Sequence, residues 1–285
     1  MRSTSAATDS VDPSFQFVRS LAAELSGGRV ELPSFPDVAA RVQQVLNDES
    51  VSQERIARVV AADAGLAARL LTMANSTLLH RGGAPVTDLK IAVTRIGHEN
   101  IRTAALAYAN AQLRRAPELA HIRGPLERYW QEGLRVAALA HAIAKESRRV
   151  RADEALLAGL LHNIGKIYIL ARLPKEGNQL DPGVLQDWYP SIGQALGENW
   201  KLPEQICAAI AGQRELERSH EGPADLPDLV IIAVHMAEQM GRNESDEAGL
   251  SKLPAAVALG LNDSALVRIM LESQTELAML QAALG

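Results

Sequence analysis

Cysteine is almost absent from this sequence. Cys207 is the only one in 285 residues, and it lies inside the apolar run ICAAI at residues 206–210. A single cysteine excludes an intramolecular disulfide and a cysteine-based metal site within the chain. This usage is typical of the cytoplasm, where we expect the protein to be located.

Aromatic side chains and long uncharged apolar runs are also scarce. Residues 1–12 are rich in Ser, Thr, Ala and Asp, and no later stretch offers about 18 uncharged apolar residues in a row. We therefore expect neither secretion nor a membrane span. Aromatics make up only 4% of the chain while hydrophobic residues make up 47%, a balance that suits closely packed helices.

Several common catalytic motifs are missing. The sequence contains no phosphate-cradling GxxxxGK[ST], no GxGxxG after a strand, no HExxH and no GxSxG. Its net charge of −5 is uneven, because residues 221–285 carry −7 and residues 1–220 carry +2. The acidic C-terminal part disfavours broad nucleic-acid binding.

What the sequence does have is apolar residues at helical spacing, without period-two runs or hairpin turns between them. We therefore predict an all-α fold, in which the wholly apolar stretch ALLAGLL at residues 155–161 lies at the centre. Ser52 and Thr87 are predicted helix caps, and Gly97 is a predicted stop. The predicted helices cover about residues 14–25, 36–46, 53–62, 63–75, 88–96, 99–113, 126–147, 153–161, 187–199, 203–214, 227–241 and 263–284.

A chain of this length forms one large domain or two packed helical subdomains. We predict a tail and short helix over residues 1–30, a first helical subdomain over residues 31–116, a second over residues 117–241, and a C-terminal helical extension over residues 242–285. The cleft between the two subdomains is the predicted binding place.

A series of short motifs resembles the HDOD family when taken in order and at this spacing. They are Leu32-Pro33-Ser34-Phe35-Pro36, DAGLAARLL at residues 63–71, Ala74-Asn75-Ser76, Pro85-Val86-Thr87, Ile96-Gly97 and AGLLHNIGK at residues 158–166. The resemblance covers about residues 31–215. It implies two packed helical subdomains, the second with a fold like the HD-domain phosphohydrolases, and a role in bacterial signal transduction without catalysis as a general property.

In an active HD enzyme, a histidine, an adjacent His-Asp pair and a later Asp hold a divalent metal that activates water. The resemblance places that pair on His162-Asn163, where a neutral amide replaces the carboxylate. It places the first histidine on Glu132. We therefore expect a degenerate site formed by His162, Asn163, Lys166 and Glu132, with no metal, no cofactor and no catalytic residue.

The remaining ligand positions of the pattern have also changed. The resemblance places Tyr189 and Gln213 where signalling HD hydrolases often have histidine, and it places the final Asp on or beside His235. His141 does not rescue the site, because it is nine positions from Glu132, about 2.5 helical turns, and the two side chains point to opposite faces.

Simpler structural interpretations stand beside these functional ones. His162 either faces a ligand pocket or ends a helix with its ring bonded to a backbone carbonyl. The segment at residues 163–166 either presents an amide and an ammonium to an anion or closes a helix with Gly165 in a left-handed turn. We interpret Trp130, Trp188, Tyr189 and Trp200 as core residues. The basic cluster of Lys145, Arg148, Arg149 and Arg151 is explained by a helix C-terminus.

Three functions remain open at this point. The first is a non-catalytic signalling protein that binds a partner protein or a small molecule, for example a nucleotide. The second is a metal-dependent phosphohydrolase of nucleotides or cyclic dinucleotides. The third is an interaction scaffold in which residues 263–284 offer an apolar edge for a partner or a homodimer, formed by Leu266, Ile269, Met270, Leu277 and Leu280.

Overall fold

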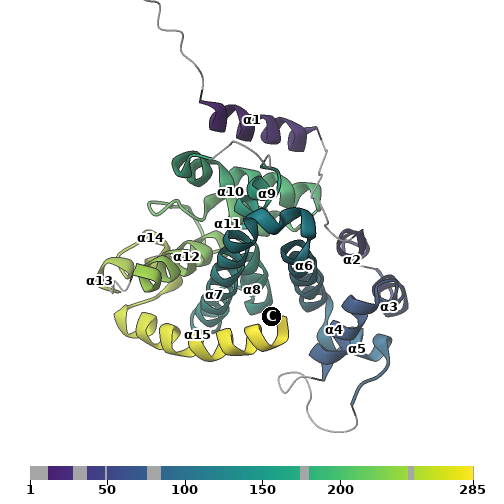
Figure 1. The fold of residues 1–285 in the computed structure, drawn as a ribbon. Helices are drawn as coiled ribbons and strands as arrows, with labels where there is room; N and C mark the ends of the chain where they lie inside the picture. The colour runs from purple at the N-terminus through teal and green to yellow at the C-terminus, as the bar shows by residue number, and fades with distance from the viewer. Residues whose placement is uncertain are drawn as a thin grey trace, which may run out of the picture.

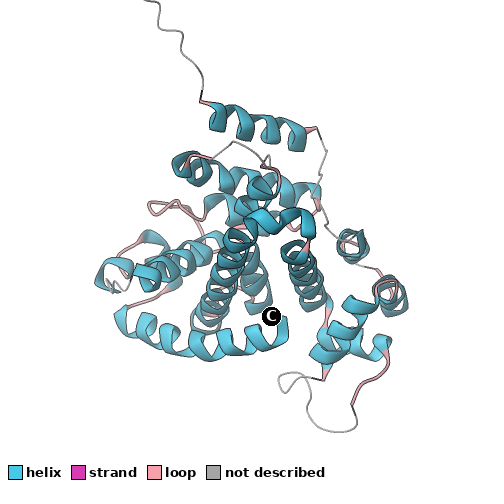
Figure 2. Cartoon of the chain, viewed as in Figure 1, coloured by secondary structure: helices cyan, strands magenta, loops and turns pink. Residues whose placement is uncertain are grey.

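The computed structural model describes residues 12–27, 37–48, 50–75, 85–173, 180–242 and 247–284, and every regular element in these ranges is helical (Figures 1 and 2). The predicted all-α fold is therefore confirmed. The motif at residues 32–36 and the predicted loops at residues 82–84 and 174–179 lie outside the described residues. The helices are α1 (Pro13–Ser26), α2 (Asp37–Leu46), α3 (Gln53–Ala61), α4 (Ala64–Ala74), α5 (Leu89–Ile96), α6 (His98–Arg115), η1 (Pro117–Ile122), α7 (Arg123–Ser147), α8 (Ala152–Leu161), α9 (Ile164–Ala171), α10 (Pro182–Asn199), α11 (Glu204–Gly212), α12 (Leu226–Arg242), α13 (Glu247–Leu250), α14 (Pro254–Leu259) and α15 (Asp263–Leu284).

Helix boundaries in the first half follow side-chain caps. Ser52 accepts a hydrogen bond from the Arg55 amide at the start of α3, as predicted. The cap of α5 is Asp88, whose carboxylate accepts from the Ile91 amide at 3.0 Å, so the prediction of Thr87 was wrong by one residue. Asp accepts this bond as readily as Thr, and periodicity alone cannot choose between two adjacent capping residues.

Helices α2 to α6 form one group with its own apolar core (Figure 1). A buried arginine ties α6 to α2, because the Arg102 guanidinium donates to the Gln43 side-chain oxygen at 2.8 Å and to the Leu46 carbonyl at 3.2 Å. Helix α6 also contacts α7 and α8, so it belongs to both halves of the molecule. The division at residues 116 and 117 stays a prediction.

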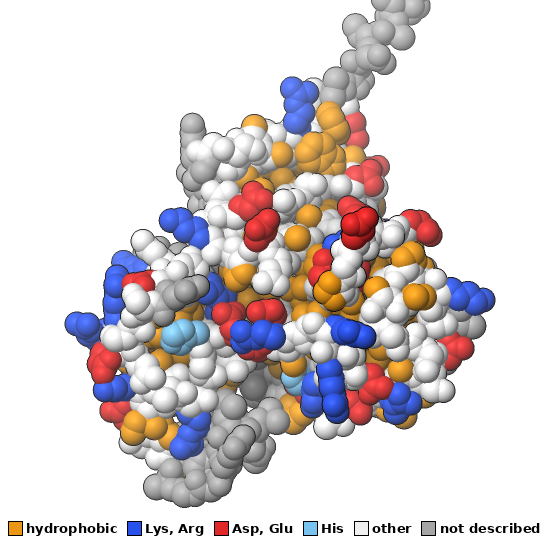
Figure 3. Space-filling model, turned by 180° about the vertical axis from the view of Figure 1, so that it is seen from behind, with side chains coloured by type: hydrophobic (Ala, Val, Ile, Leu, Met, Phe, Trp, Pro, Cys, Tyr) orange, Lys and Arg blue, Asp and Glu red, His pale blue; other side chains and the backbone are white. Residues whose placement is uncertain are grey.

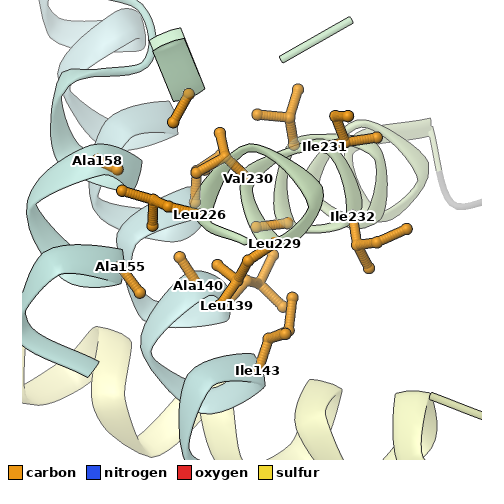
Figure 4. Packing of buried hydrophobic residues seen from close by; sticks show 14 of the residues in the cluster. Leu139, Ala140, Ile143, Ala155, Ala158, Leu226, Leu229, Val230, Ile231 and Ile232 are labelled. Atoms are coloured by element: carbon orange, nitrogen blue, oxygen red, sulfur yellow. The ribbon is translucent and has the colours of Figure 1, made fainter. Parts of the chain in front are cut away.

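Helix α7 is the centre of the second group, where α8, α12 and α15 pack around it (Figure 1). In the interior, Leu139, Ala140 and Ile143 of α7 meet Leu226 and Leu229 of α12 (Figure 4). Small residues bring α8 still closer. A Cβ atom on Gly159 would lie only 2.6 Å from the Cα atom of Ala137, so the two backbones touch there.

The chain does not end a helix at Gly165. Gly165 lies inside α9, and the glycines with positive φ among the described residues are Gly97, Gly222 and Gly260. The predicted left-handed turn was therefore wrong. Glycine is needed there for close packing instead, because a Cβ atom on Gly165 would lie 2.0 Å from the Tyr189 carbonyl oxygen of α10.

Helices α8 and α9 together form the stretch Ala152–Ala171, which is long and apolar enough by composition to cross a membrane. In its most apolar window, 89% of the residues are buried inside the protein. Burial of this extent is typical of a core segment, and His162 and Asn163 separate the two helices.

Both ends of the described chain pack onto the second group of helices. Helix α1 contacts α10, and Glu24 of α1 forms an ion pair with Arg172 at 2.7 Å. Helix α15 lies along α7, with Leu266 and Ile269 buried. Met270 and Leu277 are partly buried against the core and Leu280 is buried. The predicted apolar edge of α15 is therefore part of the core and is not free for a partner.

We predict that Gly159→Ala lowers the free energy of unfolding by about 1–3 kcal/mol, because the new methyl group forces α8 away from α7. The matched control is Gly124→Ala, whose Cβ meets nothing within 4 Å. It should leave stability unchanged or raise it by up to about 1 kcal/mol through better helix propensity. Urea denaturation measures both, and equal stability of the two variants would contradict the close approach.

The burial of α15 gives a second prediction. Leu266→Ala should cost about 2–5 kcal/mol, since it opens a cavity in a fully buried position. Leu271→Ala, on the exposed side of the same helix with the residue 62% exposed, should change stability by no more than about 0.5 kcal/mol. Thermal unfolding measures both variants. If α15 were detachable and not part of the core, neither variant would change the melting temperature of the remaining helices.

Candidate functional site

Three segments bring the four expected site residues together. Glu132 lies on α7, His162 and Asn163 form the junction between α8 and α9, and Lys166 lies in the first turn of α9. The close approach of α8 to α7 at Gly159 sets this junction beside Glu132. The junction and the first turn of α9 therefore place a histidine, an amide and an ammonium group beside one glutamate.

His162 is fully buried and contacts both the backbone and the glutamate. Its Nδ1 atom is 2.7 Å from the Gly159 carbonyl oxygen, and its Nε2 atom is 3.5 Å from Oε1 of Glu132. Because a carbonyl only accepts, Nδ1 carries a proton and donates, which leaves Nε2 directed at the carboxylate. Nε2 has no hydrogen-bond partner among the described residues. The ring of His162 thus bonds a backbone carbonyl, as the structural interpretation expects. It also faces Glu132, but the residue is fully buried and is not among those that line the cleft described below.

Lys166 supplies the positive charge of the site. Its Nζ atom lies 3.2 Å from Oε1 of Glu132, although the residue is only 5% exposed. The ammonium also lies 4.4 Å from the ring centroid of Tyr189 and 5.2 Å from that of Tyr129. Two aromatic faces and one carboxylate compensate the loss of hydration.

Asn163 is used as a hydrogen-bond donor. Its side-chain Nδ2 donates to the Tyr129 carbonyl oxygen of α7 at 2.6 Å, while its Oδ1 atom is buried without a partner in the described part of the chain. An aspartate at this position would place a carboxylate oxygen against that carbonyl. The amide therefore joins α9 to α7 in a way that the carboxylate of an HD pair does not.

Glu132 is held in its ionised form. Burial opposes the charge, but His162 and Lys166, which both lie beside the carboxylate, outweigh burial and lower the pKa of Glu132 from 4.5 to about 2. The carboxylate is therefore negative at neutral pH, and it balances the Lys166 ammonium.

Tyr189 and Gln213 support the junction from the other side. Gln213 donates to the His162 carbonyl oxygen at 2.6 Å, and the Tyr189 hydroxyl donates to the Gln213 side-chain oxygen at 3.2 Å. Burial raises the pKa of Tyr189 to about 12, so its hydroxyl stays protonated. The structure places these two residues at the site, as the resemblance implied, in positions that fix the backbone of His162.

The two remaining histidines of the sequence pattern have different surroundings. His141 contacts Glu276 of α15 at 3.2 Å, away from Glu132, as its spacing predicts. His235 lies on α12 but does not line the cleft described next, whereas its neighbour Val234 does. On α12 the cleft is lined by Val234, Ala237, Glu238 and Gly241.

A cleft of about 680 Å³ opens above Glu132 and Lys166. Cationic and anionic groups alternate around it, and it lies within the second group of helices rather than between the two groups. The sequence analysis predicted a binding cleft between the two groups. The alanine-rich α6 fills that place, because it packs directly on α7 and α8. The cleft is lined by Gly124, Glu127, Arg128, Tyr129, Gln131, Glu132, Arg135, Lys166, Gln186, Val234, Ala237, Glu238 and Gly241.

These side chains do not fit the divalent metal of an HD hydrolase. Glu132 is already neutralised by an ammonium 3.2 Å away, and Asn163 turns its NH₂ group toward a carbonyl. Tyr189 stays protonated. The Nε2 atom of His162 and the Oδ1 atom of Asn163 are the two unpaired ligand atoms among these groups, and one imidazole with one neutral amide oxygen does not make a metal site.

A second polar cluster, which the sequence analysis missed, lies before α12. His220, Asp225 and Asp228 bring one ligand atom each within 4.8 Å of one another. Arg218 donates to both carboxylates, at 2.7 Å to Asp225 and 2.5 Å to Asp228. Because the guanidinium already balances these acids, the cluster fixes the chain before α12 by itself. The spacing of Arg, His and two Asp over eleven residues was the available signal.

Comparisons with known proteins place the chain among similar folds. The model of the HDOD domain family matches residues 32–216. A curated protein of Treponema pallidum (strain Nichols), named only as uncharacterized, is 22% identical over 232 residues. That match covers 75% of this chain and 43% of the relative, so the chain spans less than half the length of that protein.

Solved structures from bacteria share the fold over nearly the whole chain. A candidate metal-dependent phosphohydrolase from Shewanella amazonensis SB2B has a TM-score of 0.66 at 24% identity, covering 93% of this chain and 99% of its own. An HDOD domain protein of unknown function from Geobacter sulfurreducens has a TM-score of 0.63 at 23% identity, covering 94% and 97%. A candidate signal transduction protein from Marinobacter aquaeolei VT8 has a TM-score of 0.59 at 20% identity, covering 95% and 65%. At these identities the likeness shows the fold.

The lowered pKa of Glu132 predicts a pH-dependent stability. Glu132→Gln should lower the free energy of unfolding at pH 7 by about 2–4 kcal/mol, because it leaves the Lys166 ammonium buried without its counter-charge. A depressed pKa contributes stability that is present above the unfolded value of 4.5 and is lost as the pH falls toward about 2. The difference between wild type and variant should therefore shrink between about pH 5 and pH 2.

Urea titrations at a series of pH values measure this difference. Glu217→Gln is the control, because Glu217 is exposed and lies outside the site. It should follow the wild-type curve at every pH. A Glu132→Gln difference that stays constant from neutral pH to pH 2 would show that the carboxylate charge has no stabilising role.

Proposed function

Because this chain belongs to the HDOD domain family, we propose that it is a non-catalytic regulatory protein of bacterial signal transduction, located in the cytoplasm. It acts by binding a small polar molecule, for example a nucleotide, or a partner protein at the cleft above Glu132. The closed charge balance between Glu132 and Lys166 is the observation that carries this proposal.

In a metal-dependent hydrolase, a divalent cation supplies the positive charge that carboxylates and a bound water require. Here a lysine supplies one positive charge to one glutamate, and the carboxylate of the HD pair is replaced by an amide that bridges two helices. The site is thus electrically complete with side chains alone. That arrangement supports recognition and gives no means of activating water for attack on phosphorus.

The cleft has the size and lining of a ligand site. Its volume of about 680 Å³ falls in the range of pockets for small molecules, about 300–1,000 Å³. Cationic and anionic groups from several helices line it, together with the amides of Gln131 and Gln186. A ligand that contacts α7, α9, α10 and α12 at once stabilises their present arrangement over any other that it binds less well.

A metal-dependent phosphohydrolase of nucleotides or cyclic dinucleotides is the alternative. One observation favours it, since the Nε2 atom of His162 is buried, unpaired among the described residues and directed at Glu132. The Shewanella amazonensis protein named for this activity also shares the fold. For His162 and Glu132 to bind a metal ion, the Lys166 ammonium would have to move away from Glu132.

We propose the class of binding partner from the chemistry of the cleft. A signalling protein or a small-molecule signal fits the cleft, and a homodimer is retained as a proposal. Nucleic acid is disfavoured, because the face drawn in Figure 3 mixes acidic and basic side chains and shows no continuous basic surface.

Metal analysis of protein purified without chelator tests the proposal. We expect far less than one equivalent of Mn, Fe or Mg per chain, and no cleavage of a nitrophenyl phosphodiester or of a cyclic dinucleotide when Mn²⁺ is added. Stoichiometric metal together with hydrolysis that His162→Ala abolishes would instead establish the phosphohydrolase.

Calorimetric titration of wild type and Arg135→Gln with a panel of nucleotides tests the cleft as the binding place. Binding by wild type, with at least about ten-fold weaker binding by the variant, supports the cleft. If no nucleotide binds, a partner protein is left as the proposed ligand of the cleft.

A further inference from the structure

Four arginines from three helices converge beside the cleft, where α6 is followed by η1 and α7. A pocket of about 310 Å³ is lined by Arg114 and Arg115 at the end of α6, by Arg123 at the start of α7, and by Glu127. Arg69 of α4 lies close enough for the charges of Arg115 and Arg114 to act on it. We propose that this arginine pocket binds the phosphate groups of a small, multiply charged anion.

The charge of the pocket is not balanced by the protein. Three guanidinium groups and one carboxylate line it. Glu127 is engaged already, because it accepts from Arg114 at 2.6 Å and from Gln131 at 2.8 Å. The side chains of Arg115 and Arg123 form no hydrogen bond or ion pair within the described ranges of the chain. An excess of positive charge without counter-charge in a concave site is what a bound anion would complete.

Ordinary helix electrostatics explains only part of the cluster. Arg114 and Arg115 lie in the last turn of α6, where the backbone dipole favours cations. Arg123 lies in the first turn of α7, where the same dipole disfavours a cation, and α7 has neither an acid in its first turn nor a side-chain cap. Arg69 lies in the middle of α4, half-buried. The helix dipole therefore opposes a cation at Arg123 and does not account for one at Arg69.

The arginines nearest the protein interior are held in place before any ligand binds. The Arg114 guanidinium stacks 4.7 Å from the ring centroid of Trp130, a residue that is 1% exposed, and it donates to Glu127. The Nε atoms of Arg69 and Arg114 are buried without a hydrogen-bond partner in the described residues. Burial, followed by the charges of Arg115 and Arg114, also lowers the pKa of Arg69, which is the expected sign for crowded cations.

The geometry favours phosphate over other anions. Planar guanidinium groups bind phosphate oxygens through paired hydrogen bonds, and a group with several negative charges engages several arginines at once. A volume of about 310 Å³ is at the small end of ligand pockets, so it suits an oligophosphate or the phosphate end of a nucleotide. Glu127 lines both this pocket and the larger cleft, so the two are neighbours, but the inference does not depend on the cleft having a ligand.

Calorimetric titration of the full chain with tripolyphosphate at low ionic strength tests the inference. The double variant Arg115→Gln/Arg123→Gln removes the two exposed, unengaged arginines of the pocket. The control Arg19→Gln/Arg149→Gln removes the same charge at exposed positions on α1 and after α7. We expect wild type and control to bind tripolyphosphate with similar affinity, and the pocket variant to bind at least about ten-fold more weakly. GTP in place of tripolyphosphate should show the same dependence on the two arginines.

Stability of the unliganded protein provides a second readout. If the arginines serve a ligand, the pocket variant melts at the same temperature as wild type or higher, because repulsion between like charges is relieved. A lower melting temperature would assign them a structural role. The inference is also overturned if wild type binds neither probe, if the control loses as much affinity as the pocket variant, or if a single-stranded oligonucleotide binds more tightly than tripolyphosphate through the same arginines.

Discussion

The backbone contact between α8 and α7 at Gly159 is the constraint on which the site depends. Any larger residue there would separate the two helices, since a Cβ atom would already lie 2.6 Å from Ala137. A second contact of this kind, Gly165 against the Tyr189 carbonyl oxygen, fixes α9 on α10. His162 and Lys166 lie just beyond these two glycines. Their distances from Glu132 are therefore set by packing, with no need for a bound ion to hold the junction together.

The changes in the site are mutually consistent in charge. An HD hydrolase balances carboxylates with a divalent cation, and removing only the metal would leave buried like charges. Here the amide of Asn163 replaces the carboxylate of the pair, and Glu132, at the position of the first histidine, faces the ammonium of Lys166 at 3.2 Å. The amide also gains a hydrogen bond to Tyr129 that a carboxylate cannot donate. The amide of Asn163 and the ion pair of Glu132 with Lys166 therefore belong to a single electrostatic solution.

The sequence predicted the helices well because their apolar periodicity is strong, and the order of its motifs picked out four residues that the structure brings together. It did not predict α9, since IGKIYILA is short, lacks a polar face and follows directly on α8. Nor did it predict the ion pair of Glu132 with Lys166, which spans 34 residues of sequence. The arginine pocket was missed for the same reason, because Arg69, Arg114 and Arg123 meet only when α4, α6 and α7 are packed. Periodicity reports which side of a helix is buried and says nothing of which polar groups meet across helices.

The two pockets and the C-terminal helix are joined by a chain of polar contacts. Glu127 lines both pockets and bonds to Arg114 and Gln131, and Gln131 accepts from Gln281 of α15 at 3.3 Å. Contact alone does not make such a chain a signalling route, because coupling requires an element with two arrangements that a ligand binds unequally. Helix α7 cannot be that element through its middle, where Gly159 and the leucines of α12 and α15 fix it. Its first turns are different, since Arg123, Gly124, Glu127 and Arg128 are all exposed there. Residues of this end of α7 line both pockets, so a ligand in either pocket contacts these turns.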